Sequence, residues 1–144
     1  MNRLEELLRR FEDLNVVVLG DFVADAFVYG EISRISREAP VLVLQHRETQ
    51  IVPGRGANAV HNLRTLGANP LPVGVVGDDA EGHHMLDFFN TLGIPTRGIR
   101  MSKTYRTPTK TRILAGAVHS HRQQIVRIDS GGPAETTNEQ GFLE

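Results

Sequence analysis

Two short segments hold polar residues whose types and spacing could bind a ligand. The first is Gly20-Asp21-Phe22-Val23-Ala24-Asp25, which follows a run of β-branched residues. Ligands of open α/β sheets bind outside the carboxyl ends of the strands. A carboxylate at that place can accept hydrogen bonds from two hydroxyl groups of a polyol. Asp25 is therefore a candidate for holding a polyhydroxylated ligand, and the alternative is that Asp21 or Asp25 only caps a turn.

The second segment, residues 53–60, runs from a glycine-rich turn into a predicted helix. Gly54 and Gly56 allow the backbone to approach a ligand closely, and the start of the helix offers free N–H groups. Arg55 can bind a phosphate through two nitrogens, and Asn58 offers both a donor and an acceptor to hydroxyl groups. The alternative is a glycine-rich turn with a purely structural role.

The same glycines also satisfy a loose dinucleotide-binding pattern, Gly54-x-Gly56-x-x-Ala59, with Asp78 about 20 residues further on. That pattern belongs directly after the first buried strand of a βαβ unit. Here the preceding residues 46–50 are polar and do not resemble a core strand. Capping of the following helix explains Asp78 as well, so a dinucleotide-binding domain is the less favoured alternative.

An α/β pattern of helices and buried strands positions these segments. Apolar residues at helical spacing, caps and terminal glycines mark the helices, and unbroken β-branched runs mark strands that are covered on both faces. The pattern predicts a helix over 2–14, a central strand over 15–20, a helix over 57–66 ended by Gly67, a buried strand over 71–76, and a helix capped by Asp79 and ended by Gly93.

Two β-rich stretches fall outside this pattern. Residues 26–52 combine short apolar runs with arginine-rich links, which predicts short strands with one exposed side. Residues 109–129 contain two β-rich runs around a turn, which predicts a hairpin. A parallel sheet needs cover on both faces and usually more strands than the rest of the chain offers. The chain, residues 1–144, is therefore expected to be part of one unfinished domain.

Composition excludes several classes of function. The 144 residues are 40% hydrophobic and 23% charged with a net charge of −1, so no general attraction to nucleic acid or to an anionic membrane is expected. There is no apolar run near the roughly 20 residues that a spanning helix needs, and no export signal, so a cytoplasmic location is expected. The absence of cysteine excludes disulfides and thiolate ligands. Adjacent His83 and His84 point apart on a helix, and no metal site is expected.

Taken together, these residues resemble the amino-terminal signature of ribokinase-type (PfkB) carbohydrate kinases. The closer similarity is to the bacterial D-glycero-D-manno-heptose-7-phosphate kinases. It is carried by residues 30–41, Asn58, Asn62, Leu66-Gly67-Ala68, residues 109–112 and residues 123–129. Two positions depart from that subgroup: Arg37 stands where its pattern has proline, and Gly54-Arg55-Gly56 stands where it has Gly-Gly-Ala. Arg55 is similar to the basic residue of ribokinases, which leaves the exact sugar open.

The resemblance implies an incomplete ribokinase-like α/β fold, with a parallel sheet, helices and a small β lid made of about residues 26–52 and 110–129. It implies that Asp25, Gly54, Arg55 and Asn58 bind the sugar. The hairpin is basic, and its Lys110 and Arg112 are the best candidates to bind a substrate phosphate. The lid is expected to close over a sugar phosphate and to pair with the lid of a second subunit.

The same resemblance implies ATP and Mg²⁺ as cofactors, with sites mostly outside this chain. The family's Gly-Ala-Gly-Asp loop, which carries the general base and the anion hole, does not occur in the sequence, nor does its Asn-x-x-Glu segment. No catalytic residue is therefore assigned, and the chain alone is expected to be inactive. A sugar kinase that phosphorylates O1 of a heptose 7-phosphate is the expected function of the whole. The alternative is a non-catalytic fragment that binds sugar or dimerises.

Overall fold

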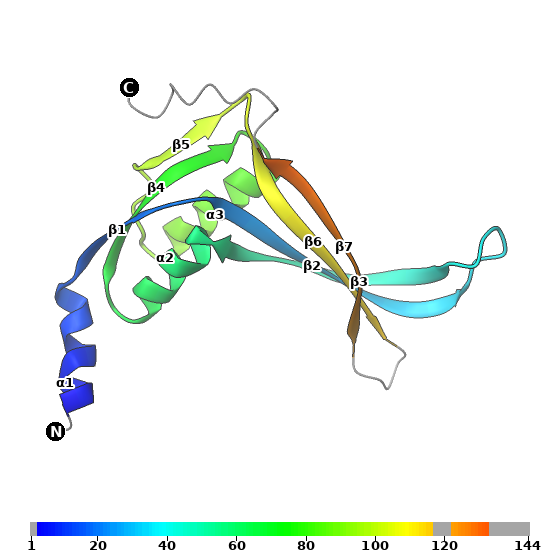
Figure 1. The fold of residues 1–144 in the computed structure, drawn as a ribbon, viewed down its shortest axis with the longest axis horizontal. Coiled ribbons are helices and arrows are strands. Elements are labelled where there is room, and N and C mark those ends of the chain that lie inside the picture. The colour runs from blue at the N-terminus through cyan, green and yellow to red at the C-terminus, as the bar shows by residue number, and fades with distance from the viewer. Residues whose placement is uncertain (1–2, 117–121, 133–144) are drawn as a thin grey trace.

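The computed structural model describes residues 3–116 and 122–132. Along these residues the helices and strands form two sheets and a layer of helices (Figure 1). Their order is α1 (Arg3–Arg9), a 3-10 helix η1 (Arg10–Asp13), β1 (Asn15–Leu19), β2 (Phe22–Ile35), β3 (Leu42–Arg55), α2 (Gly56–Thr65), β4 (Asn69–Gly77), α3 (Ala80–Thr91), β5 (Ile99–Ser102), β6 (Arg106–Gly116) and β7 (Gln123–Gly132).

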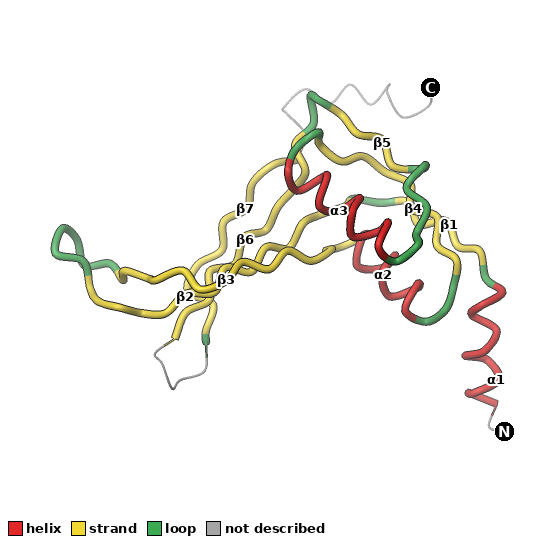
Figure 2. The backbone as a smooth tube through the Cα atoms, turned by 180° about the vertical axis from the view of Figure 1, so that it is seen from behind, coloured by secondary structure: helices red, strands yellow, loops and turns green. Residues whose placement is uncertain are grey.

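The first sheet is parallel and has the strand order β1-β4-β5. Helices α2 and α3 lie on one of its faces, as the view from behind shows (Figure 2). The expectation that residues 15–20 form a central strand covered on both faces is wrong for the described chain. Among the described residues β1 pairs only with β4, and Val17 and Leu19 are 64% and 68% exposed. The short strand β5 was not expected.

The second sheet has the order β3-β2-β6-β7 and extends beyond the helices (Figure 1). The hairpin expected over 109–129 is confirmed as the antiparallel pair of β6 and β7. The short strands expected over 26–52 are instead β2 and β3, each 14 residues long. Shifts of register after Tyr29 and after Ile32 interrupt their pairing, which explains why the apolar alternation looks broken in the sequence.

The helices behind the first sheet confirm the expected boundaries. Gly67 and Gly93 follow α2 and α3 with φ of 98° and 65°, a conformation that glycine adopts without strain. The core between helices and strands is formed by Phe22, Ala24, Ala57, Val60, Val76, Met85, Phe89 and Ile94. Phe22 and Ala24 belong to β2, so the base of the second sheet is anchored in this core.

The amino-terminal helix expected over 2–14 is confirmed as α1 followed by η1. The helix points away from both sheets (Figure 1). Neither α1 nor η1 contains a buried residue. The leucine stripe that predicted the helix therefore remains exposed, with Leu4 at 65%.

Candidate functional site

The polar face of the second sheet carries most of the residues that the sequence singles out. Phe22 and Ala24 of β2 point into the core, and side chains alternate along a strand, so Val23 and Asp25 point to the opposite face. The register of the strands places Lys110 of β6 beside Asp25 and Asp129 of β7 beside Lys110. We call this side the polar face; it carries Asp25, Lys110, Arg112, Arg127 and Asp129.

Asp25 forms the central contact of the polar face. Its Oδ1 lies 2.5 Å from Nη1 of Arg112, and the two side chains are only 21% and 23% exposed. The Arg112 guanidinium also lies over the ring of Phe27, 5.2 Å from its centre. The sequence placed Asp25 after the carboxyl end of the first strand, with capping of a turn as the alternative. In the structure Asp25 lies inside β2, because that strand begins already at Phe22. A carboxylate held by a stacked arginine is oriented before any ligand arrives.

Gly54 of β3 packs directly against this carboxylate. A Cβ atom added at Gly54 would lie 2.9 Å from Cγ of Asp25, closer than side chains normally approach. Gly54 is buried and pairs with Val23. The close packing of its backbone on Asp25 therefore explains the glycine at this position, whereas the sequence suggested an approach to ligand.

We predict that Gly54→Ala disrupts the site without unfolding the protein. The added methyl group must push the Asp25 carboxylate away from Arg112, so affinity for the sugar phosphate that the family resemblance implies is expected to fall by about tenfold or more. Gly20→Ala is the matched control, because a Cβ atom there meets nothing within 4 Å. Calorimetric titration of both variants measures the difference. Equal affinity in the two variants would contradict the role given to this packing.

Arg55 lies at the edge of the polar face, at the junction of β3 and α2. Its φ is 49°, a left-handed conformation that is uncommon for a residue with a side chain. Its Nη1 lies 3.5 Å from Oδ2 of Asp21, and both side chains are more than half exposed. Arg55 and Lys110 therefore both present cations here, at a cleft of about 220 Å³. The cleft is lined by Val23, Arg55, Pro108, Thr109, Lys110, Asp129, Ser130 and Gly131.

Asn58 is exposed in the first turn of α2. The described contacts bring Asp25, Gly54 and Arg112 together directly. Lys110 and Arg55 line the cleft described above, which those three residues do not line. The described contacts do not bring Asn58 into contact with these residues. Sequence reasoning missed Phe27 and Asp129, although the alternation along β2 and β7 contains the signal for both.

Three further carboxylates follow the carboxyl ends of β1 and β4. Asp21 contacts Arg55, and Asp78 lies 2.9 Å from Nε2 of His83 instead of capping α3. Asp79 caps α3, as expected, by accepting from the backbone N–H of Gly82 at 2.8 Å. Burial alone would raise the pKa of Asp79, but hydrogen bonds from Thr107 and Gly82 and the charge of Arg106 hold the pKa below its usual value.

These carboxylates do not form a cation site. Among the described residues, no three His, Cys, Asp or Glu side chains gather at a spacing that would hold a metal ion. Kinases usually hold Mg²⁺ through one or two carboxylates together with the phosphates of the substrate. This finding therefore concerns only a site made of protein side chains alone, and we derive no step through the ion. In the same residues, no helix has the length and apolar character needed to cross a membrane.

The glycine motif of the dinucleotide hypothesis is not in the context that it needs. Gly54 belongs to β3, which runs antiparallel to β2, and α2 follows directly. A dinucleotide-binding motif stands between a parallel strand and its helix in a βαβ unit. The geometry therefore argues against a dinucleotide-binding domain.

The fold of this chain is similar to part of solved sugar-kinase structures. Two solved structures share the fold: a ribokinase of Arabidopsis thaliana complexed with ribose and ATP, and a carbohydrate kinase from Agrobacterium tumefaciens. Each has a TM-score of 0.59 and overlaps 81% of this chain; they are 19% and 21% identical to it, and the overlap is 36% and 35% of their own chains. Residues 13–140 match the model of the pfkB family of carbohydrate kinases, and the chain belongs to this family.

Curated relatives share higher identity. The bifunctional protein HldE of Helicobacter pylori (strain J99) is 43% identical over 114 residues, which are 79% of this chain and 24% of the relative. The protein of the same name from Hyphomonas neptunium is 37% identical over 143 residues, 96% of this chain and 28% of the relative. The chain thus spans about a quarter of the length of these relatives.

Proposed function

We propose that this chain supplies the sugar-phosphate-binding part of an ATP-dependent carbohydrate kinase. The acceptor that we propose is a heptose 7-phosphate, phosphorylated on O1. The single observation that carries the proposal is the Asp25–Arg112 pair on the polar face, with Gly54 packed against it and Lys110 beside it. Family membership supports the kinase class. The HldE relatives and the resemblance to heptose-7-phosphate kinases support the choice of sugar.

The charges on the polar face suit a substrate that is both polyol and anion. Asp25 can accept hydrogen bonds from two sugar hydroxyls and so fix the orientation of the ring. Arg112 and Lys110 are cations within the same face, and Arg55 is a third at the edge of the cleft. Guanidinium groups bind phosphate through two parallel hydrogen bonds. In this proposal the carboxylate holds the sugar and the cations hold the distal phosphate.

The second sheet would act as a lid over the bound sugar phosphate. A closed lid excludes water, which otherwise competes with the sugar hydroxyl for the transferred phosphoryl group. ATP and Mg²⁺ would be bound mostly by other parts of a complete kinase. The exposed edge and face of β1, with Val17 and Leu19, support this arrangement because further sheet and helices could cover them. Phosphate transfer from ATP to heptose 7-phosphate by a complete kinase that contains this chain tests the proposal.

The opposite side of the lid has the properties of a dimer interface. The register groups Ala26, Val28, Ile113, Val126 and Ile128 on one face, which we call the apolar face. Near its base this face is covered by α3, since Ala24 belongs to the core with Met85 and Phe89. Further out, Val126 and Ile128 are 44% and 52% exposed. We propose that a second copy of the chain covers this part of the lid.

We predict that Ile128→Lys weakens this dimer. A two-fold interface places both copies of the new charge in the same buried patch, so the dimer dissociation constant should rise at least about tenfold. Ile125→Lys is the matched control: Ile125 is 46% exposed on the same strand, but it lies at the shift of register between β6 and β7 and is not one of the residues that the register groups on the apolar face. Light scattering over a range of concentrations measures both. Equal dissociation constants would place the interface elsewhere, and so would a control variant that dissociates while Ile128→Lys does not.

A further inference from the structure

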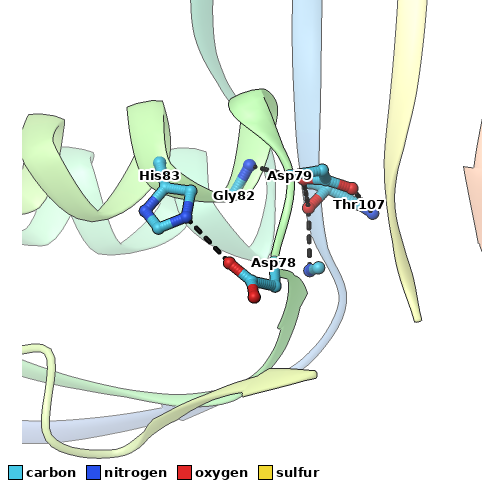
Figure 3. A network of polar contacts seen from close by, with 6 residues as sticks. Asp78, Asp79, Gly82, His83 and Thr107 are labelled. Carbon is cyan, nitrogen blue, oxygen red and sulfur yellow. Dashed lines mark hydrogen bonds and ion pairs between the residues drawn. The ribbon is translucent and has the colours of Figure 1, made fainter. Parts of the chain in front are cut away.

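Within the described residues, three chain connections join the second sheet to the α/β body. β1 leads into β2 and β3 leads into α2 within two residues or fewer, so these two connections are short. The third is the segment between β5 and β6, residues 103–105, which is longer. A cluster of hydrogen bonds around Asp79 lies at this third connection (Figure 3).

Asp79 joins the start of α3 to the start of β6. Its Oδ1 accepts from the backbone N–H of Gly82 at 2.8 Å and from Oγ1 of Thr107 at 2.7 Å. Its Oδ2 accepts from the backbone N–H of Thr107 at 2.8 Å. Thr107 Oγ1 in turn accepts from the backbone N–H of Gly77, at the end of β4, at 2.9 Å. One carboxylate thus joins α3 to β6, and the Thr107 hydroxyl adds β4.

A helix cap alone does not need this arrangement. Capping α3 uses one oxygen and the N–H of Gly82, whereas the other oxygen accepts from the N–H of Thr107. Thr107 is 3% exposed, so its N–H and hydroxyl depend on these partners. The lowered pKa of Asp79 agrees with a carboxylate whose oxygens are occupied by donors. The charged and titratable neighbours of Asp79 are Arg106, directly before Thr107 in the chain, and Tyr105, two residues before it.

The position of Thr107 determines where residues of β6 and β7 that line the cleft lie. Lys110 follows it by three residues on the same strand. On β7, Gly131 packs on the backbone of Thr107 so closely that a Cβ atom there would lie 2.9 Å from the Thr107 carbonyl carbon. Asp129 precedes Gly131 by two residues and also lines the cleft. Both β6 and β7 are therefore placed by the residue that Asp79 holds.

We propose that Asp79 is a positioning residue that latches the base of the second sheet to helix α3 and so sets the place of Lys110 and Asp129 relative to Arg55 and Asp25. This inference rests on the proposed function for its consequence, namely sugar-phosphate binding. The latch itself does not depend on that function. Asp79 does not touch the substrate in this account; it acts through Thr107.

The test compares two neighbouring carboxylates on the chain itself. Asparagine caps helices as well as aspartate, so Asp79→Asn retains the cap through its oxygen but presents an NH₂ group to the N–H of Thr107. We expect the Thr107 amide to exchange with solvent about tenfold faster or more, with the amides of α3 unchanged. Heptose 7-phosphate affinity should fall by a similar factor. Asp78→Asn is the control, because Asp78 contacts His83 within the body.

A second pair of variants covers the case in which the new amide group of Asp79→Asn rotates by 180° and presents its oxygen to Thr107. Thr107→Val removes the hydroxyl at nearly constant shape, whereas Thr107→Ser retains it. Faster exchange at the amide of Gly77 and weaker binding are expected for valine, with serine restoring both. The same exchange at Thr107 in Asp79→Asn and Asp78→Asn, or the same binding in the valine and serine variants, would overturn the latch. Failure of the unaltered chain to bind heptose 7-phosphate would instead contradict the proposed function, while amide exchange would still decide the latch.

Discussion

Asp25→Ala is expected to lower kcat/KM for the sugar phosphate by about 100-fold or more in a complete kinase that contains this chain. The change removes the acceptor that we assign to two sugar hydroxyls. It also leaves the guanidinium of Arg112, which is only 23% exposed, without its carboxylate. Leaving this partly buried charge without a partner costs free energy, and the arginine side chain is expected to move from the position in which it binds the substrate. Steady-state kinetics with varied sugar phosphate at saturating ATP measures the loss.

The matched control for this variant is Glu31→Ala. Glu31 is a carboxylate on the same strand, β2, and it is likewise paired with an arginine, Arg47 of β3, with 27% of its side chain exposed. Its removal disturbs the second sheet by loss of an ion pair but does not touch the polar cluster around Asp25. We expect kcat/KM to change by less than about threefold. Similar losses in both variants would indicate that Asp25 acts through the stability of the sheet and not through the sugar.

The second large effect concerns the chain on its own. The 144-residue chain is expected to show no phosphate transfer and little or no affinity for Mg-ATP. Each group that we assign to a ligand lies on the sugar side, and the described residues contain no group of three or more His, Cys, Asp or Glu that could hold a metal ion. Phosphoryl transfer depends on positioned cations and donors around the transferred group, and we assign none of these to this chain. Titration with Mg-ATP and a transfer assay on heptose 7-phosphate check both statements.

Turnover by this chain would reverse the assignment. Saturable binding of Mg-ATP together with product formation would mean that the nucleotide site lies within these residues. The segment from Gly54 to Asn58 would then be the first candidate to hold phosphates, because α2 begins there and the N–H groups of a first helical turn are free to bind an anion. A variant of Arg55 would distinguish a nucleotide phosphate from a sugar phosphate at that place.

Local signals in the sequence were sufficient for the helices. The cap at Asp79 and the glycines after α2 and α3 act within a few residues, and the structure confirms all of them. The hairpin of β6 and β7 is also a local pairing and was predicted. The unbroken apolar run of β1 was misleading. It indicates that both faces of the strand can be buried, but β1 alternates between exposed and half-buried residues in the described chain.

Contacts between distant segments could not be predicted in this way. The parallel pairing of β2 with β6 joins distant parts of the sequence: Asp25 and Arg112 are 87 positions apart in the chain. The place of Asp25 after a buried strand, the basic hairpin around Arg112 and the family resemblance identified both residues as candidates, and only the register shows that they meet. The same is true of Asp79 and Thr107: the capping pattern accounts for one oxygen of the carboxylate, and nothing in the local sequence indicates the partner of the other.

A calorimetric titration of the 144-residue chain with heptose 7-phosphate tests the central claim most directly. The account predicts saturable binding to the unaltered chain, weaker binding of the same heptose without its phosphate, and loss of binding in Asp25→Ala. The comparison of the two sugars tests the cations Lys110, Arg112 and Arg55, and the variant tests the carboxylate. No binding by the unaltered chain, or binding that neither the phosphate nor Asp25 affects, would contradict the proposal that the polar face holds the sugar phosphate.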